Sequence, residues 1–160
     1  MAIVTIKELK AALKPGARLM GIDHGEKTWG LALSNPDLTI ATPLKTLRFT
    51  KFGACVKELA ALCTEYNVGG FVIGLPLHMG GQEGPRVMSV RHFADNLLQA
   101  KNIFGFEPVI AFQDERLSTF AAESRLIDDL NMPREKRRDV IDAHAAAHIL
   151  QAALEEIRKN

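Results

Sequence analysis

The run Leu19-Met20-Gly21-Ile22-Asp23 is followed by the polar segment His24-Gly25-Glu26-Lys27 and then by Trp29-Gly30-Leu31-Ala32-Leu33. Two short apolar runs around a polar break that contains glycine predict a β-hairpin. The first run is continuously apolar, which is typical of a strand buried on both faces. We therefore expect Asp23 where a buried strand leaves the core. An ordinary turn aspartate is the alternative interpretation.

The segments on either side of this hairpin alternate between strand and helix patterns. Before it, Thr5-Ile6-Lys7-Glu8 has the spacing of a capping box and begins a short helix that should end at Pro15-Gly16. The elements expected after it are a third strand within 38–47, a helix with an apolar stripe from Phe52 to Tyr66 closed by Gly69-Gly70, a strand over 71–74, a helix over 86–101, a strand over 108–112, a helix from Ser118 or Thr119 to about Leu130, a basic turn from Pro133, and a last helix from near Arg138 to Lys159. This order predicts an α/β fold, a mixed sheet with helices on both faces.

Length and composition fit one globular domain over residues 1–160, with 1–17 as an N-terminal helical extension. The net charge of +1 requires a nucleic-acid binder to use a local basic patch. Cys55 and Cys63 lie eight positions apart in one predicted helix, roughly 12 Å, which is beyond disulfide reach. They are expected to be core residues of a protein in a reducing compartment. No apolar run approaches a membrane span and the start is not a secretory signal, so we expect a cytoplasmic protein without a membrane partner.

Three acids occupy comparable positions at the ends of predicted elements. Asp23 ends the first strand, Glu115 follows the strand over 108–112, and Asp142 lies in the first turns of the last helix beside several alanines. Small residues let a helix pack closely on a sheet, which would bring Asp142 over the strand ends. Clustered carboxylates repel one another unless they bind cations or have raised pKa values, and carboxylate oxygens suit Mg²⁺ or Mn²⁺. The alternatives are a favourable position of Asp142 at the positive helix end and an ion pair of Glu115 with Arg116.

Two further segments have both a structural and a functional interpretation. The basic cluster over 134–138 is by default a solvated charged turn, but beside an acidic metal site it could hold a phosphate backbone. Asp139 is one helical turn from Asp142 and could also reach the site. The glycine-rich segment 74–85 is either a surface loop or a flap that contacts substrate.

Several motifs together resemble one known family, the YqgF family, also called the RuvX or RuvC-like family. The segments that carry the resemblance are Gly21-Ile22-Asp23-His24-Gly25-Glu26-Lys27, Gly74-Leu75-Pro76-Leu77, Glu83-Gly84-Pro85-Arg86, Asp114-Glu115-Arg116-Leu117-Ser118-Thr119 and Ile141-Asp142-Ala143-His144-Ala145-Ala146. The resemblance spans Leu19 to about Leu154. It implies a ribonuclease H-like fold with a five-stranded mixed sheet, and divalent-metal nuclease chemistry.

The resemblance also implies roles for individual residues. Asp23, Glu115 and Asp142 match the acidic triad and are expected to be catalytic and to bind metal, whereas Asp139 is not on a triad position. The residues that match substrate-contacting positions are Lys27, Arg86, Arg116, Arg137 and Arg138, the last two within the segment 134–138. Two positions depart from the family pattern, His78 in place of asparagine and Gly80 in place of aspartate or asparagine, which affects the expected contacts of that loop.

Three functions remain open at this point. The resemblance favours processing of the 5′ end of precursor 16S ribosomal RNA, with ribosomal particles as partners. Holliday-junction resolution on branched DNA would use the same chemistry, with one Mg²⁺ or Mn²⁺ ion between Asp23 and Asp142 and a second near Asp23 and Glu115. A resolvase normally acts as a two-fold dimer, so a monomer would count against it; monomer and homodimer both remain open. A non-catalytic RNA-binding module is the third function, although such a module would be expected to have lost some of the acids.

Overall fold

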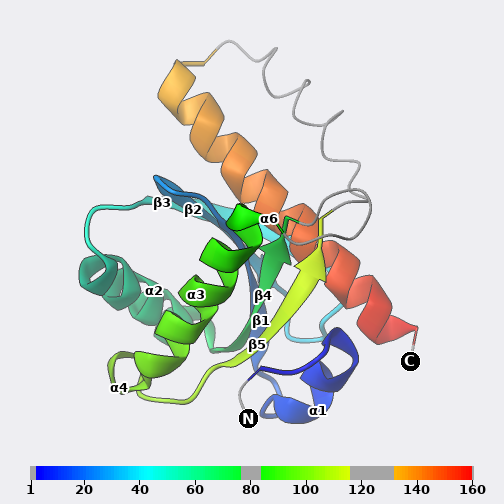
Figure 1. The fold of residues 1–160 in the computed structure, drawn as a ribbon. Helices are drawn as coiled ribbons and strands as arrows, with labels where there is room; N and C mark the ends of the chain where they lie inside the picture. Colours follow the sequence, from blue (N-terminus) through cyan, green and yellow to red (C-terminus); the bar gives the residue numbers. More distant parts are fainter. Residues whose placement is uncertain (1–2, 77–83, 116–131, 160) are drawn as a thin grey trace.

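The computed structural model describes residues 3–76, 84–115 and 132–159. Five strands form one sheet in the order β3-β2-β1-β4-β5 (Figure 1). Their bounds are β1 Arg18–His24, β2 Thr28–Ser34, β3 Ala41–Arg48, β4 Val68–Leu75 and β5 Val109–Asp114. β1, β2 and β3 pair antiparallel, whereas β1, β4 and β5 run parallel. The sheet is therefore mixed and five-stranded, as predicted.

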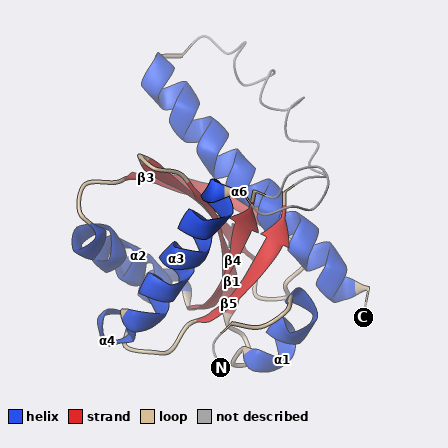
Figure 2. Cartoon of the chain, in the orientation of Figure 1, coloured by secondary structure: helices blue, strands red, loops and turns tan. Residues whose placement is uncertain are grey.

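Helices cover both faces of this sheet (Figure 2). One face carries α2 (Phe52–Tyr66), α3 (Pro85–Gln99) and the short α4 (Lys101–Phe104), and the other carries the long α6 (Arg134–Arg158). The helix predicted from Ser118 or Thr119 to Leu130 lies outside the described residues. Among the helices that the structure describes, none has both the length and the apolar character needed to cross a membrane.

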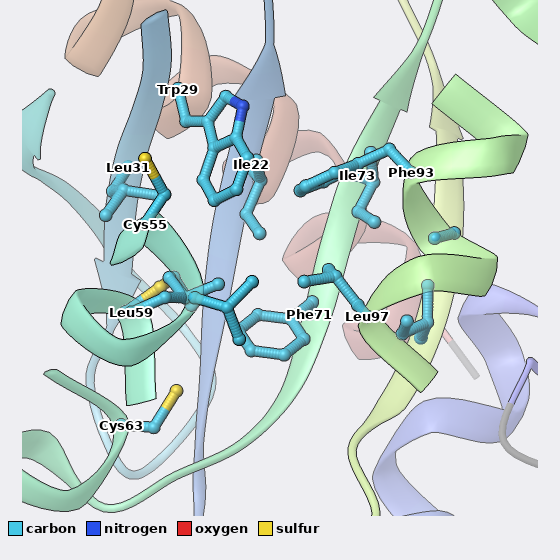
Figure 3. Close-up of a cluster of buried hydrophobic side chains, with 14 of the residues drawn as sticks. Ile22, Trp29, Leu31, Cys55, Leu59, Cys63, Phe71, Ile73, Phe93 and Leu97 are labelled. Carbon is cyan, nitrogen blue, oxygen red and sulfur yellow. The ribbon is translucent and has the colours of Figure 1, made fainter. Parts of the chain in front are cut away.

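Side chains along each strand alternate between the two helical layers. The α2/α3 face holds the larger apolar core, in which α2 and α3 enclose the side chains of the inner strands (Figure 3). Its central members are Ile22, Trp29, Leu31, Cys55, Leu59, Cys63, Phe71, Ile73, Phe93 and Leu97. Both cysteines are free and buried, as expected for small core residues.

The α6 face is packed through glycines on the sheet and alanines on the helix. A Cβ atom on Gly21 would lie 2.6 Å from the backbone oxygen of Ala146 and 2.8 Å from the Cβ of Leu150. A Cβ atom on Gly30 would overlap the backbone of Asp142. The predicted close packing of the last helix is therefore confirmed, and it depends on the absence of side chains at these two strand positions.

The boundary between α2 and β4 differs from the prediction. α2 ends at Tyr66, and Asn67 adopts the left-handed conformation (φ 55°) that closes the helix, a conformation that asparagine tolerates. Gly69 and Gly70 belong to β4 instead. Their small size serves packing, because a Cβ atom on Gly70 would lie 2.9 Å from the backbone oxygen of Val109.

The last helix begins at Arg134, one turn earlier than predicted. Pro133 precedes it with φ −54°, a value that suits the start of a helix, and the arginines and lysine that follow are good helix formers. The basic segment 134–138 is therefore helical, which corrects its interpretation as a turn. Asp142 lies eight residues past the helix start, so the positive helix end does not account for its position.

The N-terminal segment is shorter in its helical part than predicted. The Glu8 carboxylate accepts a hydrogen bond from the Thr5 backbone N–H at 3.0 Å, which confirms the capping box. The turns that follow are η1 (Ile6–Glu8) and α1 (Leu9–Ala12), so the helix ends before Pro15. Ile3 forms a parallel bridge with Ile110 of β5. The segment thus lies along the outer edge of β5.

We expect Gly30→Ala to lower the free energy of unfolding by about 1–3 kcal/mol, because the added methyl group would displace the α6 backbone at Asp142. Urea unfolding followed by circular dichroism measures this change. Gly53→Ala is the matched control, since a Cβ atom there would meet nothing within 4 Å. Equal stability of the Gly30→Ala protein and the unmodified chain would show that α6 is not fixed at this point.

Candidate active site

Two of the predicted acids lie at one end of the sheet because β1, β4 and β5 run parallel. Asp23 is next to last in β1, and Glu115 directly follows β5. Both side chains lie on the α6 face. Asp23 is two residues after Gly21 in β1, so the two lie on the same face of the strand. The Glu115 carboxylate fills the space that a side chain at Gly74 would occupy. The Glu115 backbone N–H donates to the Leu75 oxygen at 3.3 Å, which fixes the chain as it leaves the sheet.

The third acid comes to the same end from α6. The Asp142 backbone rests on Gly30, and Gly30 is the partner of Asp23 across the β1–β2 ladder. The Thr28 hydroxyl donates a 2.8 Å hydrogen bond to the Asp142 carboxylate. The structure therefore brings Asp23, Glu115 and Asp142 to one rim of the sheet, as the sequence predicted.

Burial and mutual repulsion disfavour the charged forms of these acids. The pKa of Asp23 is raised to about 6, first by burial and then by the charge of Asp142. The pKa of Glu115 is raised to about 7, first by burial and then by the charges of Asp23 and Asp114. Burial likewise raises the pKa of Asp142, although the Thr28 hydrogen bond opposes this. Asp23 is thus electrostatically coupled to both other members of the triad.

Among the described residues, Arg86 is a cation whose charge acts on two of these acids. It is the second residue of α3, and its guanidinium donates to the His24 backbone oxygen at 3.4 Å. Its charge lowers the pKa of both Asp23 and Glu115, partly offsetting the effect of burial. The His24 ring stacks on Phe93 of the same helix with 4.3 Å between ring centroids. The Arg86 hydrogen bond thus holds the start of α3 beside the end of β1, and the ring contact holds the middle of the helix there.

The other predicted basic residues are less closely grouped. Lys27 is exposed in the β1–β2 turn, and Arg138 is exposed on α6, where its charge lowers the pKa of Asp142. Arg137 is half-buried on the same helix. Arg116 lies outside the described residues, as do His78 and Gly80 of the expected substrate loop.

Sequence reasoning missed two residues that act on Asp142. Thr28 is one of them. It lies two residues before Gly30, and therefore on the same face of β2, which is the feature of the sequence that could have identified it. Arg48 is the other: it is the β3 partner of Thr28, and its charge lowers the pKa of Asp142. The Asp139 carboxylate accepts hydrogen bonds from Arg48 at 3.2 and 3.4 Å, and its charge raises the pKa of Asp142.

The donor set fits a divalent cation better than it fits a softer metal. In the described ranges, no group of three histidine, cysteine or carboxylate side chains is placed to hold an ion by itself. The acids form two electrostatically coupled pairs that share Asp23. Magnesium and manganese ions need few protein carboxylates, because water and substrate phosphates complete their coordination. A bound cation would also remove the repulsion that raises these pKa values.

Comparisons with known proteins bear on the family and the fold. Residues 17–156 match the family model described as "RuvX: Holliday junction resolvase". A Rhodospirillum centenum protein named "Putative pre-16S rRNA nuclease" is 52% identical over 99% of this chain and 84% of its own length. A Ruegeria pomeroyi protein of the same name is 44% identical over 99% of both chains. The structure of Thermus thermophilus RuvC with a Holliday junction substrate superposes with a TM-score of 0.53 at 16% identity, covering 88% of this chain and 94% of that one. This likeness confirms the ribonuclease H-like fold.

The raised pKa values predict how stability depends on pH in metal-free protein. An unfolded aspartate titrates near pH 4, so as the pH rises from about 4 to about 7 the unfolded state releases protons before the folded state and the free energy of unfolding falls. Asp23→Asn removes one such group. We expect it to raise the free energy of unfolding at pH 8 by about 3 kcal/mol and to change it little at pH 4.

Urea unfolding in EDTA at the two pH values measures this difference. Asp37→Asn, at an exposed turn position, is the matched control. A destabilised Asp23→Asn protein at pH 8 would contradict the idea that Asp23 is held in an unfavourable charged state.

Proposed function

The chain belongs to the RuvX family, and we propose that it is a divalent-metal-dependent nuclease that hydrolyses phosphodiester bonds near the 5′ end of precursor 16S ribosomal RNA. The observation that carries this proposal is the convergence of Asp23, Glu115 and Asp142 at one rim of the sheet, where burial and repulsion raise their pKa values. The names of the two relatives support the RNA substrate. Ribosomal particles are the expected partners.

The three acids have distinct tasks in this proposal. Asp23 and Asp142 would hold one Mg²⁺ or Mn²⁺ ion, and Asp23 with Glu115 would hold a second. When bound, such ions supply an activated water and stabilise the departing 3′ oxygen. Thr28 holds the Asp142 carboxylate in place through its 2.8 Å hydrogen bond. Arg86 keeps positive charge beside Asp23 and Glu115.

Basic residues around the rim would contact the phosphate backbone. Lys27 directly precedes Thr28, Arg138 lies one helical turn before Asp142, and both basic residues are exposed. Arg86, Arg116 and Arg137 complete the set that we propose for the substrate. Each phosphate contact should make binding more sensitive to salt, because it releases a bound counterion.

Residues 1–160 are proposed to act as one ribonuclease H-like domain that includes the N-terminal extension over 1–17. Three contacts support this. Val4 donates its backbone N–H to Ile110 at 2.8 Å, and Ile6 and Leu9 are buried in the same apolar cluster as α6. The extension therefore completes the core next to β5.

Holliday-junction resolution is the second candidate function. The family description and the RuvC fold favour it. It would use the same acids on branched DNA, but it would require two copies of the chain to cut opposite strands symmetrically. A non-catalytic RNA-binding module is less well supported, because such a module gains nothing from two repelling pairs of half-buried carboxylates that share Asp23.

The nuclease proposal predicts metal-dependent cutting that Asp142→Asn abolishes. The assay compares both proteins on a precursor ribosomal RNA leader and on a four-way DNA junction, with Mn²⁺, with Mg²⁺ and with EDTA. We expect RNA cleavage only with metal, and a loss of about 100-fold or more in the variant. Mn²⁺ should also raise the melting temperature of the unmodified chain more than that of the variant.

Other outcomes of this assay distinguish the candidates. Symmetric cutting of the junction with intact RNA would replace the ribosomal function with resolution. Binding of RNA without any cleavage, in the presence of either metal, would favour the binding module. Asp37→Asn serves again as the control for a surface aspartate and should cut like the unmodified chain.

Thr28→Val should lower kcat about 10-fold with little change in KM, because it removes the hydrogen bond that orients Asp142 while leaving substrate contacts intact. Thr28→Ser retains the hydroxyl and should restore most of the activity. Steady-state kinetics with Mn²⁺ on the RNA leader separates the two parameters. A Thr28→Ser protein as slow as Thr28→Val would indicate that the methyl group, and not the hydroxyl, is what matters at this position.

A further inference from the structure

An exposed aromatic ring lies at the same end of the sheet as the candidate active site. Phe49 directly follows β3 and is 40% exposed. Its backbone N–H donates to the Lys27 oxygen at 2.8 Å. The next residue after Lys27 is Thr28, which holds Asp142. Phe49 is therefore fixed to the backbone of the turn that supports the third acid.

The Phe49 ring rests on a buried aromatic cluster. Its centroid is 5.8 Å from that of Trp29, a residue that is only 1% exposed. Trp29 in turn contacts the rings of Phe52 at 6.1 Å and Phe93 at 4.8 Å. Because these neighbours hold it from below, Phe49 loses little conformational freedom when a flat ligand stacks on it. Of the large hydrophobic residues exposed in the described part of the chain, Ile40, Met88 and Ile103 are aliphatic and Phe49 alone is aromatic.

Two exposed lysines lie close to this ring along the backbone: Lys27, whose oxygen accepts the Phe49 N–H, and Lys51, two residues further along the chain. Lys27 and Lys51 are exposed, and neither forms an ion pair with another described residue. Lys51 is the N-cap residue of α2, whose first turn contains no acid and receives no hydrogen bond from a capping side chain. Arg48 is exposed as well but shares its charge with Asp139, and Glu26 is the acidic residue of the β1–β2 turn. An uncapped helix start beside two lysines favours phosphate groups.

The placement of these groups suits a nucleic-acid strand that crosses the end of the sheet. Phe49 packs against Trp29, on the α2/α3 side, whereas Asp23 and Asp142 lie on the α6 side of the same rim. A nucleic-acid strand with one base on the Phe49 ring could pass Lys51 and Lys27 and then reach the acids. In double-stranded nucleic acid the bases are already stacked on one another, so only an unpaired base can use an aromatic side chain in this way.

We propose that Phe49 stacks on an unpaired base of a single-stranded nucleic acid, with Lys27 and Lys51 contacting the flanking phosphates. This inference deepens the proposed function, on which it rests, by specifying that the strand near the acids is single-stranded. Stacking of a base on an aromatic side chain is independent of sequence, since every base has a flat aromatic surface. The Phe49 ring and the two lysines therefore hold the substrate, and other contacts determine the cleavage position.

The test measures binding of a short single-stranded RNA by fluorescence anisotropy, with the full chain in EDTA so that no cleavage intervenes. Phe49→Leu keeps the apolar volume but removes the aromatic surface, and we expect it to weaken binding about 10-fold. Phe49→Tyr should bind within about 2-fold of the unmodified chain. Binding of duplex RNA should be nearly the same for all three proteins. The single tryptophan, Trp29, adds a second readout, because a base on Phe49 should quench its fluorescence.

Ile40→Ala is the matched control. Ile40 is 59% exposed and precedes β3, at the opposite end of the sheet from Phe49, so its loss should leave binding and quenching unchanged. Lys27→Gln and Lys51→Gln change only surface residues, and each should reduce the slope of log affinity against log salt by about 1. A melting curve would reveal whether Phe49→Leu disturbs the packing of Trp29. If it does, the two lysine variants still test the proposed binding surface.

Equal affinity of Phe49→Leu and the unmodified chain for single-stranded RNA would overturn the proposal, and would leave Phe49 as a contact for another macromolecule such as a protein. The outcome is separate from that of the cleavage assay. Weaker binding by Phe49→Leu, together with an unmodified chain that does not cut RNA, would support base stacking on Phe49 and contradict the proposed nuclease activity. If Phe49→Leu binds RNA normally and the unmodified chain cuts RNA, only the proposal of base stacking on Phe49 is contradicted.

Discussion

The close approach of α6 to the sheet is the constraint on which the rest of the structure depends. Gly21 and Gly30 have no side chains, so the helix backbone at Ala146 and Asp142 lies directly on β1 and β2. Any larger residue at these strand positions would displace the helix. Since Asp142 sits on Gly30, and Gly30 pairs with Asp23, this one contact sets the distance between two acids that are far apart in the sequence. The alanines of α6 contribute the matching smooth surface.

This geometry has an electrostatic consequence. Partial burial raises the pKa values of all three carboxylates at this rim, and the charges of Asp142 on Asp23 and of Asp23 on Glu115 raise two of them further. Positive side chains from three different elements offset part of this cost: Arg86 from α3, Arg48 from β3 and Arg138 from α6. The remaining unfavourable charge is what a divalent cation would neutralise. The same feature that makes the metal-free rim unfavourable therefore makes it suited to bind cations and phosphates.

The two faces of the sheet divide the work at this rim. The α6 face carries the acids and the Thr28 hydroxyl that orients one of them. The α2/α3 face carries the aromatic cluster of Trp29, Phe93 and Phe49, together with the start of α2. A strand crossing the end of the sheet could contact both. The β1–β2 turn connects the two sides. The Lys27 backbone oxygen accepts a hydrogen bond from Phe49, and the hydroxyl of the adjacent Thr28 donates one to Asp142.

The sequence by itself determined the order of the described strands and helices along the chain and the mixed sheet, and it pointed to the three acids as candidates, because apolar periodicity and motif spacing are local properties of the chain. It misplaced the start of α6 and the role of Gly69 and Gly70, because a charge run or a pair of glycines is compatible with several local structures. Only the tertiary structure decided that Thr28 and Arg48 act on Asp142, and that Phe49 stays exposed on a buried tryptophan. These relations depend on strand register and on the depth at which a helix packs, and both are set by contacts between residues distant in sequence, which no local pattern records.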